Sequence, residues 1–331
     1  MDKATAEGRI CLFDNIKFFL IATVAVGHII DFATAESDVY KSIFLFIYSF
    51  HMPLFLFLSG VFNKNRDTKK KVISFIFLGF AIKILLTLSK LLINGKASFS
   101  LLSDGGLPWF MFVMGAFYLI SYLLRDADKR LVLLMSVLVA CFVGYDSSIG
   151  DWLYLSRTVV FYPFFVLGEM TSPEKLTELN GKKILKAAGV AVLLIWGAVC
   201  LFCIDDVYML RPLFTGRNSF SVNPAFEKWG MLYRLLCYVI TAVVSFCIIC
   251  AVPSRKIPLV SDFGSRTIQV YFWHWPVVLI MEKTGLLTLL FSTPVGKLVA
   301  MLIGVVITFI LSMKPFGFPS DNILRSFKKS R

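Results

Sequence analysis

Long stretches of apolar residues, separated by short polar and charged segments, dominate the chain. A helix needs about 20 predominantly apolar residues to cross the hydrocarbon core of a bilayer. The pattern therefore predicts an all-α, polytopic membrane protein with about ten transmembrane helices. These helices are expected at residues 16–35, 41–62, 72–93, 107–124, 131–146, 156–171, 184–204, 230–252, 265–282 and 286–313.

Basic residues concentrate in every second connection between these helices. Because basic connections stay in the cytoplasm, an even helix count with this alternation places both termini there. The basic connections and the end of the chain contain Lys64, Arg66, Lys69, Lys70 and Lys71; Arg125, Lys129 and Arg130; Lys175, Lys182, Lys183 and Lys186; Arg255 and Lys256; and Arg325, Lys328, Lys329 and Arg331. The opposite connections are acidic or weakly charged, with Glu36 and Asp38, Asp146 and Asp151, or Asp205 and Asp206.

Composition agrees with a membrane protein. The hydrophobic share is 57%, against about 45–50% in soluble proteins. The net charge of +13 lies in short blocks between apolar runs, which is typical of membrane orientation signals and argues against nucleic-acid binding. The seven cysteines mostly fall in or beside apolar segments and are interpreted as small buried hydrophobes. We expect a single membrane-embedded domain over residues 1–331, with no appended soluble domain and no removable signal.

All three histidines, His28, His51 and His274, fall inside predicted transmembrane helices. An ionisable side chain at bilayer depth tends to face a bundle interior or a wet cavity and to mark a substrate or proton path. These residues are therefore the first candidates for chemistry. Because they are far apart in the sequence and lack nearby carboxylates, and because no Gly-rich phosphate loop is present, we expect no metal site.

The first predicted helix carries a polar stripe. Lys17 and His28 are eleven residues apart, about 16 Å along a helix, so Lys17 is expected near the cytoplasmic boundary and His28 near mid-bilayer. Alternatively, Lys17 snorkels to the interface and His28 only bonds a neighbouring helix. The stripe consists of Asp14, Lys17, Ile21, Ala25, His28 and Asp31.

Two further helices carry histidines. In the second, Pro53 frees a backbone carbonyl around Ser49, which His51 can satisfy, and Ser59 lies at the cytoplasmic end. In the ninth, Thr267, Tyr271 and His274 share a face; the alternative is an interfacial belt formed by Trp273 and Trp275.

Arginines mark two other places. Arg157 enters the membrane, where its fork of donors suits an oxyanion or an anionic donor, although it can also be a boundary snorkeler. The connection 205–229 contains Arg211, Arg217, Asn218 and Trp229. We interpret it as a solvated loop, the alternative being a cap over an outward-facing cavity.

Several of these motifs, in this order, resemble the acyltransferase-3 family of integral membrane acyltransferases, particularly short members such as fucose O-acetylases and polysaccharide O-acetyltransferases. The resemblance spans essentially the whole chain, and Lys17 stands where the family frequently has arginine. The matching segments are 13–17 with 26–28, 50–55 with Ser59 and Gly60, 107–110 around Trp109, Arg157 with 163–168, and 271–274.

The resemblance implies transfer of an acyl group, usually acetyl, from cytoplasmic acetyl-CoA to a sugar hydroxyl of a lipid-linked or cell-surface glycan, in a bacterial inner membrane. A neutral imidazole, with a reference pKa of about 6.5, makes His28 the expected base, and Arg157 or His51 the stabiliser of the oxyanion. We further hypothesise that Asp14, as a catalytic residue, and Lys17 line the cytoplasmic mouth. Acetyl-CoA is expected to be bound by Lys17, Lys69, Lys70 and Ser59, and the acceptor by Trp109, Tyr271 and His274.

Two alternatives stay open at this point. Within the enzyme class, a covalent acyl-enzyme relay can carry acetyl across the bilayer. Outside it, ten helices with intramembrane histidine and arginine also describe a proton-coupled transporter or flippase, although no inverted repeat is visible.

Overall fold

The computed structural model describes residues 10–64, 67–103 and 106–326, and over these ranges it is helical without a β-strand. The all-α prediction is therefore confirmed for the described chain. Four of the charges used to predict orientation, Arg66, Lys328, Lys329 and Arg331, lie outside these ranges.

A helix stands at each predicted apolar segment. Six segments within the described residues are long and apolar enough to cross a membrane, so the chain is an integral membrane protein. They are Cys11–Glu36, Asp38–Val61, Thr68–Asn94 (α4), Lys183–Phe202 (α9), Pro224–Ala251 (α12) and Pro294–Leu311 (α16). The helices at the other predicted positions have 14 to 17 residues, and the count of ten crossings stays a prediction: α5 (Trp109–Leu123), α6 (Lys129–Phe142), α7 (Leu155–Glu169) and α14 (Thr267–Lys283).

Two predicted helices are interrupted. The segment 41–62 forms α2 (Asp38–Tyr48) and α3 (His51–Val61), with Phe50 at a non-helical φ of −139° between them. The segment 286–313 forms α15 (Leu286–Phe291) and α16, because the Thr293 side chain accepts from the Gly296 N–H and Pro294 occupies the first turn. The prediction of one continuous helix was wrong in both cases.

The search for 20-residue apolar runs also missed short helices. In α8 (Pro173–Gly181), Ser172 caps the first turn, and the Asn180 amide donates to the carbonyls of Ile249 and Val252 at 2.8 Å, which ties α8 to the end of α12. The other short α-helices are α10 (Ile204–Val207), α11 (Arg211–Phe214), α13 (Val260–Phe263) and α17 (Ser320–Ser326).

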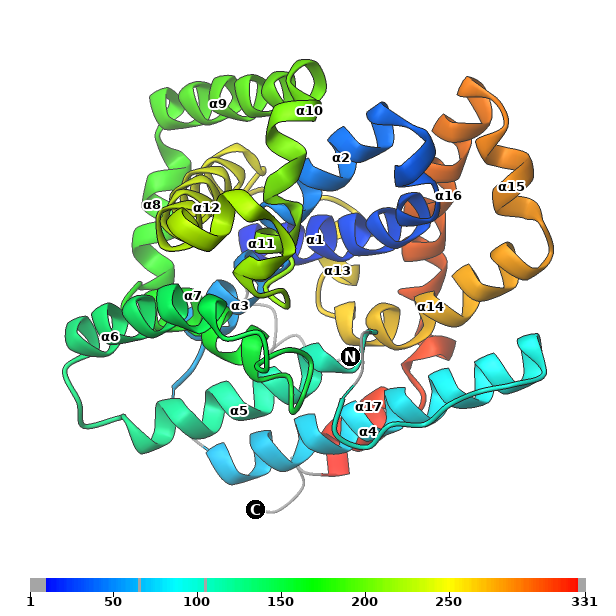
Figure 1. Cartoon of the computed structure of the whole chain (residues 1–331). Coiled ribbons are helices and arrows are strands. Elements are labelled where there is room, and N and C mark those ends of the chain that lie inside the picture. Colours follow the sequence, from blue (N-terminus) through cyan, green and yellow to red (C-terminus); the bar gives the residue numbers. More distant parts are fainter. Residues whose placement is uncertain (1–9, 65–66, 104–105, 327–331) are drawn as a thin grey trace.

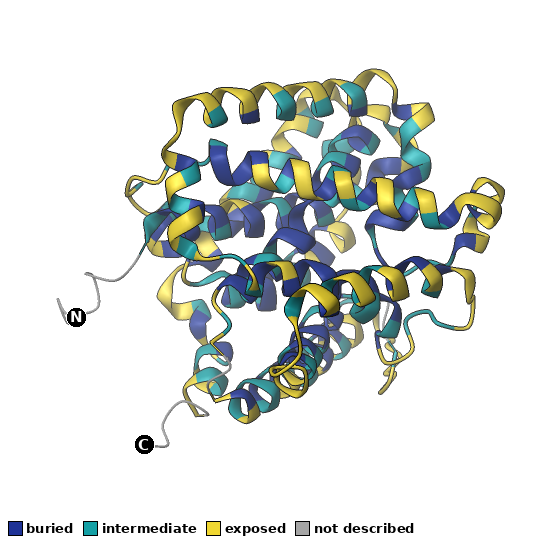
Figure 2. Ribbon diagram, turned by 90° about the vertical axis from the view of Figure 1, so that its left-hand side faces the viewer, coloured by how far each residue is buried: buried dark blue, intermediate teal, exposed yellow. Residues whose placement is uncertain are grey.

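Helix α1 (Cys11–Ile30) lies at the centre of the bundle, where it contacts α2, α3, α13, α14 and α16 (Figure 1). Its Leu12, Ile16 and Leu20 side chains are fully buried. Figure 2 shows buried residues gathered in the interior and exposed ones on outward faces. Peripheral α9 exposes large apolar residues such as Leu194 and Ile195, as expected where lipid replaces protein.

A buried carboxylate joins the helix ends that lie next to the end of α3. Glu169, at the end of α7, pairs with the Lys129 ammonium at 2.9 Å and accepts hydrogen bonds from Ser121 and from the Asn63 amide. This network fixes α5, α6 and α7 against one another, and the sequence analysis did not identify it.

Helices α3 and α7 pack with their backbones in direct contact. A Cβ atom on Gly60 would collide with the Phe165 carbonyl oxygen, and one on Gly168 would collide with the Phe57 carbonyl oxygen. Both helices carry candidate catalytic residues, His51 and Arg157, so this glycine contact sets how closely those residues approach.

We predict that Gly60→Ala and Gly168→Ala each lower the melting temperature of the detergent-solubilised protein. Each added methyl group meets a backbone carbonyl that cannot move independently, and overpacking of this kind costs about 1–3 kcal/mol. Gly197→Ala on α9 is the matched control, because its Cβ would meet nothing closer than Phe46 at 3.9 Å. An unchanged melting temperature in both Gly60 and Gly168 variants would contradict this packing.

Candidate active site

The principal cavity has a volume of about 430 Å³ and lies where α1, α3, α7 and α14 meet. We call it the His28 cavity. Three of the predicted catalytic residues reach it from separate helices: His28 from α1, His51 from α3 and Arg157 from α7. Its remaining walls are Val24, Asp31, Phe44, Tyr48, Met52, Lys90, Gly106, Leu107, Trp109, Phe161, Arg211, Phe214, Thr215, Arg217, Tyr271 and Trp275.

The His28 imidazole is held between aromatic rings. It stacks on His274 at 5.4 Å between ring centroids, and the Trp275 ring meets it edge-on at 5.0 Å. His274 is fully buried behind His28, with Nδ1 bonded to the Val270 carbonyl at 3.0 Å. His274 is therefore an interior residue, whereas Trp275 is half-buried and lines the His28 cavity.

The His51 ring is oriented by a backbone bond. Its Nδ1 lies 2.8 Å from the Ile47 carbonyl oxygen, two residues before the Ser49 carbonyl expected from the proline position. A carbonyl oxygen only accepts, so Nδ1 carries the proton in this bond. In the neutral ring, Nε2 is then a hydrogen-bond acceptor. His51 can therefore accept a hydrogen bond from a hydroxyl group, but it cannot donate one to an oxyanion.

The Arg157 guanidinium is buried, with 6% of the residue exposed. It lies 4.6 Å from the centre of the Trp109 ring, its Nε donates to the Thr215 carbonyl at 3.3 Å, and its Nη1 is 3.7 Å from Asp151. Nη1 has no hydrogen-bond partner among the described residues. Arg157 therefore offers a fixed donor to the cavity, and it is not a snorkelling boundary residue.

A second cavity, of about 290 Å³, lies on the other side of the Met52 side chain. We call it the Lys17 cavity, because Lys17 is its cationic wall; Ser59, Thr267 and Tyr271 also line it. Asp14 does not: it is buried behind Lys17, 4.0 Å from the ammonium, where Gly264 packs against its backbone. The expectation that Asp14 lines the mouth with Lys17 is corrected accordingly.

The other assigned lysines lie outside both cavities. Lys69 is exposed and Lys70 half-buried on the first turn of α4, and neither lines the Lys17 cavity. Lys71, the next residue, lies 4.9 Å from the Tyr118 ring, which does line it. The α4 lysines therefore stand close to this cavity without forming its wall.

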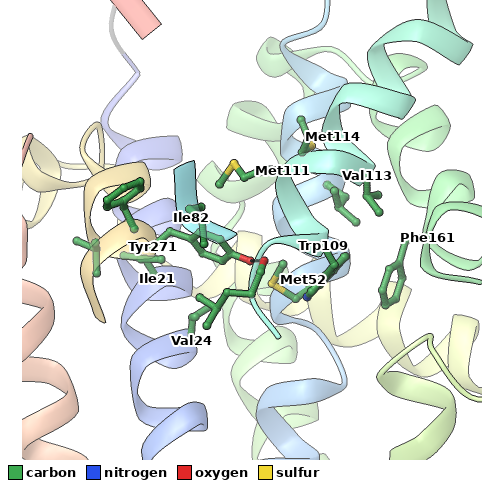
Figure 3. Packing of buried hydrophobic residues seen from close by; sticks show 14 of the residues in the cluster. Ile21, Val24, Met52, Ile82, Trp109, Met111, Val113, Met114, Phe161 and Tyr271 are labelled. Atoms are coloured by element: carbon green, nitrogen blue, oxygen red, sulfur yellow. Dashed lines mark hydrogen bonds between the residues drawn. The ribbon is translucent and has the colours of Figure 1, made fainter. Parts of the chain in front are cut away.

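Met52 and Tyr271 line both cavities and separate them. The Tyr271 ring extends from α14 towards Met52, between Ile21 of α1 and Trp109 of α5 (Figure 3). Its hydroxyl donates to the Leu107 carbonyl at 2.5 Å. The polar stripe of α1 thus follows both chambers, with Lys17 and Ile21 in one and His28 and Asp31 in the other.

The connection 205–229 covers the His28 cavity and is not the solvated loop that we expected. Arg211 and Arg217 line the cavity, and Arg211 pairs with Asp31 at 2.7 Å. Arg217 pairs with Asp151, the same carboxylate that faces Arg157. The sequence analysis named these two arginines only in its alternative interpretation, a cap over a cavity, and their charge in a connection predicted to be acidic or weakly charged was the signal for it.

No group of three or more histidine, cysteine or acidic side chains in the described ranges is placed to hold a metal ion. The absence of a metal from the reaction stays a prediction. Of the cysteines, Cys141, Cys200, Cys237, Cys247 and Cys250 are buried, as expected, whereas Cys203 is exposed.

A helical membrane bundle with histidine and arginine side chains in an internal cavity defines the class as an integral membrane protein with a polar interior site. A family model described as an acyltransferase domain matches residues 12–313. The chain belongs to the acyltransferase-3 family, and it is a membrane acyltransferase. Neither a curated protein nor a solved structure shows significant similarity to it.

The wall that Met52 and Tyr271 form between the two cavities can be tested by thiol labelling. We expect the thiol introduced by Val24→Cys to react with a membrane-impermeant maleimide only from the side of the His28 cavity. Adding Met52→Ala removes part of the wall and should allow labelling from the side of the Lys17 cavity as well. Labelling is measured from each side of oriented proteoliposomes, in a background variant that lacks Cys11 and Cys203. Thr23→Cys is the control, because residue 23 lines neither cavity. Equal labelling from both sides without Met52→Ala would contradict the separation.

Proposed function

We propose that this protein is an O-acetyltransferase that moves an acetyl group from acetyl-CoA to a sugar hydroxyl of a lipid-linked or cell-surface glycan in a bacterial inner membrane. The observation that carries the proposal is the convergence of His28, His51 and Arg157 on one cavity in a member of an acyltransferase family. Family membership favours acyl transfer over the transporter alternative.

The chemical step needs a base, an oxyanion donor and a leaving group. The acceptor hydroxyl oxygen bonds to the thioester carbonyl carbon while His28 takes the hydroxyl proton. The Arg157 Nη1 donor, which has no hydrogen-bond partner among the described residues, stabilises the carbonyl oxyanion. When the carbonyl re-forms, the carbon–sulfur bond breaks, and the proton on His28 passes to the leaving CoA thiolate.

His51 and His274 support this step without reacting. The Nε2 lone pair of neutral His51 accepts from the acceptor sugar and orients it, which follows from its bond to Ile47. His274 stacks on His28 and fixes the plane of that ring. Trp109 beneath Arg157 supplies an apolar platform on which a sugar ring can lie.

The donor approaches from the Lys17 cavity in this proposal. Lys17 and the neighbouring α4 lysines attract the CoA phosphates, while the extended pantetheine arm carries the thioester past Met52 and Tyr271 to His28. Lys17 and His28 stand about 16 Å apart along α1, so the phosphates and the thioester occupy different chambers. Direct transfer needs only this passage; in the relay alternative, an enzyme group carries the acetyl.

We predict that His28→Ala reduces acetyl transfer from radiolabelled acetyl-CoA by at least about a hundredfold, because a positioned base contributes about 10²–10⁴-fold. The assay uses membranes that contain the glycan acceptor, and saturable acetyl-CoA binding serves as the check on folding. Thr23→Ala, on α1 but outside both cavities, is the control and should keep full turnover. Turnover like that of the unaltered protein in His28→Ala would refute the base assignment.

A binding measurement tests whether acetyl-CoA is the acyl donor. The purified protein in lipid nanodiscs should bind acetyl-CoA saturably, and Lys17→Ala should weaken binding about tenfold, since a charged contact to phosphate is lost. Lys17→Arg should restore most of the affinity, and Lys186→Ala, an exposed lysine on α9, should change nothing. Dephospho-CoA and desulfo-CoA, as competitors, separate the contribution of the phosphates from that of the thioester. If well-folded protein bound no acetyl-CoA, the transporter alternative would become the better explanation.

A further inference from the structure

The His28 cavity carries an excess of positive charge that acyl transfer alone does not require. Four of its wall residues, Lys90, Arg157, Arg211 and Arg217, are cationic. Two carboxylates face them: Asp31 pairs with Arg211, and Asp151 pairs with Arg157 and Arg217. Among the described wall residues and their ion-pair partners, an excess of two positive charges therefore remains, and the other described walls are largely aromatic and aliphatic.

Two donor atoms of this group are buried without a hydrogen-bond partner among the described residues. They are Arg157 Nη1, whose ion-pair partner Asp151 is 3.7 Å away, and Arg211 Nε. A buried donor without an acceptor is costly, and the cost is higher for a charged group, so such a pair indicates an anionic ligand. One oxyanion can use Arg157 during reaction, but it does not account for Arg211, Arg217 and Lys90.

These cations also lie close to the base. Asp31, which pairs with Arg211, caps the end of α1 three residues after His28, about 4.5 Å along the helix axis. Arg211 is further oriented by the Phe44 ring, 4.6 Å from its guanidinium carbon. A negative charge bound here would therefore sit within one or two sugar rings of the hydroxyl that His28 deprotonates.

We propose that the His28 cavity takes an acceptor glycan that carries a negatively charged group, a phosphate or a carboxylate, close to the hydroxyl that is acylated. Arg211, Arg217 and Lys90 are the specificity-determining residues. This inference rests on the proposed function for the identity of the cavity as the acceptor site. The same chemistry can come from a sugar phosphate or from a uronic acid, so the test includes both.

The test measures binding to the unaltered protein in nanodiscs with three probes: glucose 6-phosphate, glucuronate and glucose. We expect at least one anionic probe to bind saturably, at least about tenfold more tightly than glucose, and more weakly as salt is added. Preference for glucose 6-phosphate identifies a phosphate, and preference for glucuronate identifies a carboxylate. Equal affinity for all three probes, or no saturable binding of either anionic probe, overturns the proposal.

Two variants with opposite expected effects on probe affinity locate the site. Arg217→Gln should lower the affinity for the anionic probe about tenfold and leave the affinity for glucose unchanged. Arg217→Lys, which keeps the charge, should retain most of the preference for the anionic probe. Asp31→Asn should raise the affinity for the anionic probe, because Arg211 loses the carboxylate that competes with the probe. Arg130→Gln is the matched control: this exposed arginine lies at the start of α6, next to Lys129 and thus at the end of the bundle opposite Arg157.

Acetyl-CoA binding, measured in parallel, separates the two hypotheses. If the anionic sugar binds as expected and acetyl-CoA does not bind at all, the proposed function fails while the anion specificity of the cavity stands. If Arg217→Gln weakens acetyl-CoA and leaves both sugar probes unchanged, the arginines hold the donor's phosphates and the proposal is overturned.

Discussion

Hydrocarbon offers no hydrogen-bond partners, so a polar side chain inside this bundle must be satisfied by another part of the chain. Lys83 is the strongest case: its ammonium is almost fully buried in α4 and donates to the Ser100 carbonyl at 2.6 Å and to the Leu101 carbonyl at 3.2 Å. Asn180 and Glu169 join helix ends in the same way. Glu169 lies on α7, the helix that carries Arg157, so its network fixes one end of the helix whose other end presents the Arg157 donor to the cavity.

The sequence predicted the parts of the fold that depend on the length of the apolar segments. Each apolar run corresponds to helix, because in lipid a single segment satisfies its own backbone hydrogen bonds only as a helix. The prediction of continuous helices failed where a side chain competes with the backbone for hydrogen bonds. His51 bonds the Ile47 carbonyl at the break between α2 and α3, and Thr293 caps a new helix within an apolar run. Short amphipathic elements such as α8 carry too few apolar residues to stand out from the connections.

The candidate site was predictable to a similar degree. Helical spacing alone placed Lys17 and His28 on one stripe, and the two cavities follow that stripe. Spacing says nothing about contacts between helices, so the stacking of His28 on His274, 246 positions away in the chain, could not be derived. Nor could the ion pairs that draw Arg211 and Arg217 over the cavity, because their partners are distant in the sequence: Asp31 in the first predicted helix and Asp151 in another connection.

The division into two chambers would solve a problem that the proposed acyl transfer poses. If a thioester donor and a glycan acceptor approach from opposite faces, they have to meet without opening a continuous aqueous path. Met52 suits the dividing wall, because an unbranched thioether side chain adapts its shape at little cost. Tyr271 is held differently, by its bond to the Leu107 carbonyl, and so provides a fixed edge against which Met52 can move. In the proposed reaction, a passage closed by one adaptable and one anchored side chain would admit a narrow acyl arm, while the arginines that line the cavity beyond it would hold the acceptor.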